Sequence, residues 1–180
     1  KFVVASFGKL TKGKGVNFLA EAIVRLKVKI PNLVALFVGE GEERAALENL
    51  IARHDLQEKI KLLGWRSDAM SVMANADLVV QPTLSEAFSQ VMGEAMWLKK
   101  PLVITDVSGA ADIIRNGENG LLVPKADAGA LAAAIEKLLA DESLRNRIAA
   151  GGRAFVEENL VIEKKIKEYE ASFIKAAGAR

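Results

Sequence analysis

The chain has 180 residues, the usual size of a single domain. It is 51% hydrophobic and 27% charged, as in ordinary globular proteins, and its net charge of +2 is too balanced to indicate nucleic-acid binding by charge alone. It contains no cysteine, which excludes a disulfide framework and a thiolate metal site. No stretch approaches the roughly 18 apolar residues of a membrane span, and the first residues do not form a signal peptide.

The sequence begins at Lys1 without an initiator methionine and opens directly on a strand-like run. We therefore expect a piece of a longer chain, with a linker or another domain upstream. The absence of cysteine agrees with a reducing compartment, so a cytoplasmic protein is expected.

Apolar runs alternate with amphipathic stretches along the chain. The runs predict strands at residues 2–7, 33–38, 60–63, 77–81, 102–104 and 121–123. Helical periodicity predicts helices at 16–29, 42–53, 68–75 and 90–98, and two or three more between 127 and 177. This alternation indicates right-handed βαβ units, and hence an α/β fold with a doubly wound, mainly parallel sheet and C-terminal helices. In such sheets ligands bind beyond the carboxyl ends of the strands.

The loop after the first strand, GKLTKGKG at residues 8–15, contains three lysines and three glycines. Glycine lets the backbone approach a ligand closely, and lysine supplies a point charge for phosphate. The spacing is neither that of a P-loop nor the G-x-G-x-x-G of a dinucleotide-dependent dehydrogenase, which disfavours both. On these residues alone, a solvated basic turn explains the loop equally well.

The loop before the fourth predicted helix, residues 85–94, is the most informative. Ser89 is a suitable N-cap, and the four positions after it carry no acidic residue. An uncharged first turn suits a helix whose free N–H groups receive an external anion such as a diphosphate. Glu86 and Glu94 flank this helix start, and carboxylates accept hydrogen bonds from neighbouring hydroxyl groups. A helix cap with a surface glutamate would explain the same residues.

Two further loops are weak signals on their own. Gly39, Glu40 and Gly41 follow the second strand, where glycine is common. Residues 105–117 are rich in small side chains, which allow a loop to fold over a ligand or a helix to start nearby.

Together these loops resemble family 4 of the glycosyltransferases, the group 1 glycosyltransferases. The resemblance covers essentially the whole chain. It rests on GKLTKGKG, VGEGEE, LLGW, the Glu-x7-Glu motif of Glu86 and Glu94, and SGAADIIRNGENGLLVP, in this order. It implies that residues 1–180 form the C-terminal, Rossmann-like, donor-binding domain of a two-domain GT-B enzyme, and that the N-terminal acceptor domain is absent.

The resemblance also implies roles for individual residues. Lys9 and Lys14 would bind the donor diphosphate and stabilise the leaving nucleotide, and Glu86 would contact the transferred sugar; these are the implied catalytic residues. Glu94 would bind the ribose hydroxyls. The other implied donor-binding residues are Gly8, Gly39, Glu40, Gly41, Trp65, Arg66, Phe88, Ser89, Gln90 and Val91, with Trp65 and Arg66 at the base.

Two departures from the family pattern affect the phosphate site. The family commonly reads Glu-Gly-Phe-Gly, whereas this chain has Ala87 and Ser89 in the two glycine positions. Both add bulk beside the phosphates. Lys9 stands where the family usually has arginine, so a bidentate fork is lost.

The resemblance implies a retaining, metal-independent enzyme without a cofactor. It would transfer a hexose-type sugar from a nucleotide-diphosphate sugar to a lipid-linked, polysaccharide or small-molecule acceptor. This domain alone would bind the donor but transfer nothing, and membrane contact, at the cytoplasmic face, would come only through the absent domain. A subunit of a split transferase and a non-catalytic sugar-nucleotide sensor are the alternatives. Without the other domain, apolar side chains among Ile162, Ile166, Tyr169 and Phe173 are expected to be exposed.

Overall fold

The computed structural model describes residues 1–177, and within them it contains one six-stranded sheet. The strands are β1 (Phe2–Phe7), β2 (Leu33–Val38), β3 (Ile60–Gly64), β4 (Leu78–Gln81), β5 (Leu102–Thr105) and β6 (Leu121–Val123). Their order is β3-β2-β1-β4-β5-β6 and every neighbouring pair is parallel. The predicted doubly wound fold is confirmed, with a wholly parallel rather than mainly parallel sheet.

The helices fall between the strands and after them. They are α1 (Val16–Leu26), α2 (Arg44–Arg53), α3 (Ala69–Ala74), α4 (Gln90–Trp97), α5 (Ser108–Ala111), α6 (Ala128–Ala140), α7 (Glu142–Asn159) and α8 (Ile162–Ala177), with a 3-10 turn, η1, at Lys12–Lys14. The sequence predicted neither η1 nor α5 as a helix. Helix α1 ends at Leu26 rather than near residue 29, and a turn at residues 27–29 separates it from Pro31.

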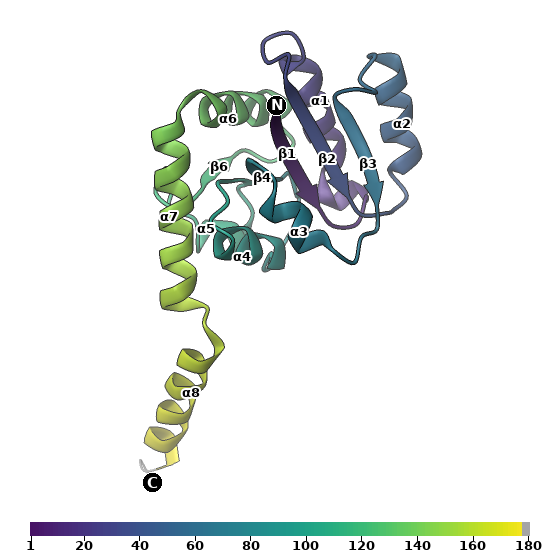
Figure 1. Cartoon of the computed structure of the whole chain (residues 1–180). Helices are drawn as coiled ribbons and strands as arrows, with labels where there is room; N and C mark the ends of the chain where they lie inside the picture. Colours follow the sequence, from purple (N-terminus) through teal and green to yellow (C-terminus); the bar gives the residue numbers. More distant parts are fainter. Residues whose placement is uncertain (178–180) are drawn as a thin grey trace.

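Helices cover both faces of the sheet (Figure 1). Helices α1, α2 and α6 bury Leu19, Leu47 and Leu131 against one face, and all three side chains are fully buried. Helix α4 buries Met92 against the other face. Helix α7 contributes to both clusters, and Val156 near its end packs on the α4 side. The strands β4 and β5 are therefore buried along their whole length, as their apolar runs predicted, whereas four of the five residues of the edge strand β3 are half-buried.

Helix α8 projects away from the body of the domain (Figure 1). Its apolar side chains Ile166, Tyr169 and Phe173 are 49%, 64% and 73% exposed, as expected. The side chain of Ile162 lies outside those described. Among the described residues, no helix is both long and apolar enough to span a membrane.

The direction of winding reverses at β1. From β1 the chain moves outward through β2 to β3, and it then returns to place β4 on the other side of β1. The loops that follow β1 and β4 at their carboxyl ends therefore lead away from each other. A crevice at such a reversal is the usual ligand position in open parallel sheets.

Candidate functional site

Two adjoining hollows lie at the carboxyl ends of the strands. One, of about 380 Å³, is lined by Phe7, Gly8, Lys14, Gln81, Glu86, Phe88, Ser89, Gln90 and Val91. The other, of about 450 Å³, is lined by Phe7, Gly8, Lys9, Val38, Gly39, Glu40, Trp65, Arg66, Ala69, Val91 and Glu94. Phe7, Gly8 and Val91 belong to both, so the two hollows form one continuous cleft. We call them the Glu86 hollow and the Glu94 hollow.

The cleft gathers almost all of the predicted site residues. Every one of them except Gly41 lines one of the two hollows. Gly41 instead lies against the backbone of the first loop, where a Cβ would be only 2.3 Å from the carbonyl oxygen of Leu10. Four further residues line the cleft without a signal in the sequence. Phe7, Val38 and Gln81 lie at strand ends and resemble ordinary core residues there, and Ala69 begins helix α3.

An ion pair joins the first and third loops inside the Glu86 hollow. Lys14 Nζ donates a hydrogen bond to Glu86 Oε2, although the two residues lie 72 positions apart. The loops are also joined through their backbones, because Leu84 donates its N–H to the carbonyl oxygen of Gly13 at 2.9 Å, and Thr83 Oγ1 donates to the same oxygen at 3.2 Å. The cation and carboxylate are 34% and 21% exposed, so they face each other across a partly shielded hollow.

The N-terminus of α4 opens onto the same hollow. Ser89 is extended and 4% exposed, and its side chain accepts a hydrogen bond from the N–H of Met92 at 3.2 Å. This confirms the predicted N-cap. The first turn has no acidic residue, and Gln90 and Val91 at its start line the hollow. The helix therefore presents an end that favours an anion.

Helix α5 supports the loop that carries Glu86. The N–H of Gly109 donates to the carbonyl oxygen of Glu86 at 3.2 Å. A Cβ at Gly109 would lie 1.9 Å from the carbonyl oxygen of Ala87, so only glycine permits this approach. The small residues around Gly109 are evident in the sequence, but their contact with the Glu86 loop was not predicted.

Gly109→Ala is expected to lower the free energy of unfolding by about 1–3 kcal/mol, because the Glu86 loop must move away from the added methyl group. Urea unfolding measures the change. Gly93→Ala is the matched control, since a Cβ there has nothing within 4 Å and alanine is the better helix former. Equal stability of the Gly109→Ala protein and the parent would contradict the proposed support.

The far end of the Glu94 hollow combines an aromatic ring with an ion pair. The Trp65 side chain is 76% exposed at the hollow. Arg66 does not extend its guanidinium freely, because its Nε and Nη2 donate to the two carboxylate oxygens of Asp68 at 2.7 and 2.6 Å. The hydrogen bond from Arg66 lowers the pKa of Asp68 and raises that of Arg66. The exposed Trp65 ring and the remaining N–H groups of Arg66 are therefore available to a ligand at this end.

Some charged side chains of the cleft are already paired within the protein, and others are not. Glu40 accepts a hydrogen bond from Arg44 at 2.7 Å, so its carboxylate is already paired. Among the residues that the structure describes, Lys9 has no ion-pair partner, and its ammonium is free to meet an anion. Within residues 1–177 no group of three or more His, Asp and Glu side chains is placed to hold a metal ion.

Comparison with known proteins identifies the family. Residues 1–155 match the family described as "Glycosyl transferases group 1". The lipopolysaccharide core biosynthesis glycosyltransferase LpsE of Rhizobium meliloti (strain 1021) is 35% identical over 150 residues, which cover 83% of this chain and 43% of that protein.

Solved structures share the fold. The structure of Anabaena HepE in complex with UDP matches with a TM-score of 0.87 and 30% identity, over 96% of this chain and 49% of that one. The C-terminal domain of the group 1 glycosyltransferase LpcC from Francisella tularensis matches with a TM-score of 0.82 and 28% identity, over 90% of this chain and 87% of that one. The chain thus spans less than half the length of LpsE and about half that of HepE, but most of the LpcC domain. It belongs to the group 1 glycosyltransferases.

Proposed function

We propose that this domain binds the nucleotide-diphosphate sugar donor of a retaining, metal-independent glycosyltransferase that transfers a hexose-type sugar. The observation that carries the proposal is the two-part cleft. One part contains Lys14, Glu86 and the open end of α4, and the other contains Glu94 and the Trp65 ring. A sugar nucleotide has the same division into a sugar, a central diphosphate and a nucleoside.

The diphosphate would lie over Gly8 and Val91, where the two hollows meet. The end of α4 and the ammonium groups of Lys9 and Lys14 would then offset its charge, in the place of a divalent cation. Phosphate near Lys14 would compete with Glu86 for that ammonium, and the released carboxylate would accept hydrogen bonds from the sugar.

The nucleoside would occupy the Glu94 hollow. The carboxylate of Glu94 would accept hydrogen bonds from the ribose hydroxyls, and the base would lie against Trp65. The solved complex of HepE with UDP supports a nucleotide as the ligand. Retention of anomeric configuration rests on the resemblance to family 4.

The acceptor would be held by a second domain, outside the residues described here. The match to most of the LpcC C-terminal domain supports this assignment. This domain alone would therefore bind the donor without transferring the sugar. Closure of the second domain would complete the site and exclude water.

Calorimetric titration with nucleoside diphosphates and their sugars, in a buffer with EDTA, tests the proposal. We expect one base to be preferred, with the same affinity when Mg²⁺ replaces EDTA. Glu94→Ala should weaken binding about 10- to 100-fold, because hydrogen bonds to the charged carboxylate are lost. If a folded sample binds none of the ligands, or binds them only with Mg²⁺, the proposal of a metal-independent donor site on this domain is wrong.

A further inference from the structure

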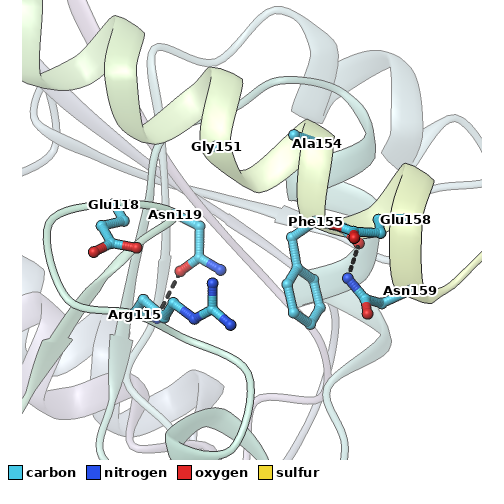
Figure 2. A pocket seen from close by; sticks show the side chains of 8 residues that line it. All are labelled: Arg115, Glu118, Asn119, Gly151, Ala154, Phe155, Glu158 and Asn159. Carbon is cyan, nitrogen blue, oxygen red and sulfur yellow. Dashed lines mark hydrogen bonds between the residues drawn. The ribbon is translucent and has the colours of Figure 1, made fainter.

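A third hollow lies apart from the donor cleft. It has a volume of about 380 Å³ and separates the C-terminal half of α7 from the loop before β6 (Figure 2). Its lining residues are Arg115, Glu118, Asn119, Gly151, Ala154, Phe155, Glu158 and Asn159. None of them lines either hollow of the donor cleft.

The floor of this hollow is held in place by Asn119, which is 4% exposed. Its Oδ1 accepts a hydrogen bond from the N–H of Arg115 at 2.7 Å, and its Nδ2 donates to the carbonyl oxygen of Ile113 at 3.1 Å. The loop also packs tightly on α7, because a Cβ at Gly151 would lie 2.3 Å from the carbonyl oxygen of Glu118. The hollow is thus formed in the free protein, as small-molecule sites usually are.

The walls carry polar groups that are not used elsewhere. In the described part of the chain, no hydrogen bond or ion pair engages the guanidinium of Arg115 or the carboxylates of Glu118 and Glu158. Asn159 donates its Nδ2 to the carbonyl oxygen of Phe155 at 3.0 Å, which leaves its side-chain oxygen as an acceptor. Figure 2 shows Arg115 on one side and Phe155 and Asn159 on the other side of the same space.

The charges and the small apolar surface of this hollow favour one class of ligand over others. A single guanidinium beside two carboxylates disfavours phosphate and other anions, and one ring with one alanine is too little apolar surface for a lipid. Planar guanidinium, carboxylate and amide groups each bond a pair of neighbouring hydroxyls, while an aromatic face packs against the C–H side of a sugar ring. We propose that this hollow binds one ring of a neutral saccharide.

The hollow is connected along the chain to the loop that carries Glu86. Helix α5 is joined to the Glu86 loop through Gly109, and the chain reaches Arg115 four residues after α5 ends. A short segment that includes α5 therefore connects the Glu86 loop with the residues of this hollow. The bound ring could belong to a free sugar or to a longer chain, and the two are distinguished by comparing ligands of different length.

Chemical-shift mapping of the chain without nucleotide tests this proposal. The probes are D-glucose, D-galactose, N-acetyl-D-glucosamine, maltotetraose and chitotetraose. We expect shifts at residues 115–119 and 154–159, with a dissociation constant on the order of 1 mM for a single ring. Equal affinity for one sugar and its tetrasaccharide would indicate a single-ring site, and a preference for the tetrasaccharide would indicate a chain.

Two variants separate binding from folding. Arg115→Ala should weaken the saccharide about tenfold, and Ala154→Trp should abolish the shifts by filling the hollow from an exposed helical position. Ala133→Trp, on the exposed side of α6, is the matched control and should leave binding unchanged. The proposal is overturned if no probe shifts these residues, if Ala154→Trp binds as the parent does, or if inorganic phosphate produces the shifts instead.

Discussion

Replacing Lys9 and Lys14 together with alanine should lower the affinity for a nucleoside diphosphate by more than about 100-fold. Both side chains line the cleft on either side of the Gly8 backbone, where the two hollows meet. Each ammonium would make a charge-assisted hydrogen bond to phosphate, of about 1.5–3 kcal/mol. Calorimetry at constant salt measures the loss, and binding of the unphosphorylated nucleoside should change little.

The same loop provides a control for this experiment. Lys12 is exposed and lines neither hollow, so Lys12→Ala should change affinity by less than about twofold. An equal loss of diphosphate and nucleoside binding in the double variant would mean that the cleft had collapsed. An unchanged affinity for the diphosphate would remove both lysines from the phosphate site.

Glu86→Gln should have opposite effects on two ligands. In the free protein Glu86 holds the ammonium of Lys14, so removing its charge releases that ammonium for phosphate. We expect affinity for the nucleoside diphosphate to rise about threefold or more. The sugar nucleotide should lose any advantage over the diphosphate, because a carboxylate that accepts hydrogen bonds from sugar hydroxyls becomes an amide. Parallel titrations with the two ligands measure the difference.

The same substitution at Glu94 provides the comparison for Glu86→Gln. Of the two hollows of the donor cleft, Glu94 lines the one that we assign to the nucleoside. Glu94→Gln should therefore weaken nucleoside, nucleoside diphosphate and sugar nucleotide to a similar degree. If Glu86→Gln behaves in the same way, the assignment of Glu86 to the sugar is wrong.

Local patterns in the sequence predicted most of the fold. The apolar run at Phe2–Phe7 and its repeats give the strands, because parallel strands buried on both faces need continuous apolar side chains. Ser89 marked the start of α4 because its side chain satisfies an N–H group that the helix leaves free. Apolar runs and helix caps depend on residues close together in the chain, so they can be recognised in a single sequence.

The contacts that complete the site act over longer distances. The pairing of Lys14 with Glu86 depends on how two loops meet across the sheet, and no local pattern encodes it. The same applies to Gly109, whose need for glycine comes from the carbonyl oxygen of Ala87 in another loop. The ion pair of Arg66 with Asp68, two residues later, was likewise not predicted from the sequence.

Strands β1 and β4 share fewer register partners than any other neighbouring pair of the described sheet. In the described sheet, these strands share two register partners, Val4 with Leu78 and Ala5 with Val79, whereas β1 and β2 share six. Residues on both sides of this junction line the proposed donor cleft, so a donor would be gripped by each half of the domain at once. A bound donor would therefore raise the free energy needed to separate the two halves by local unfolding. The domain without donor would separate there more often.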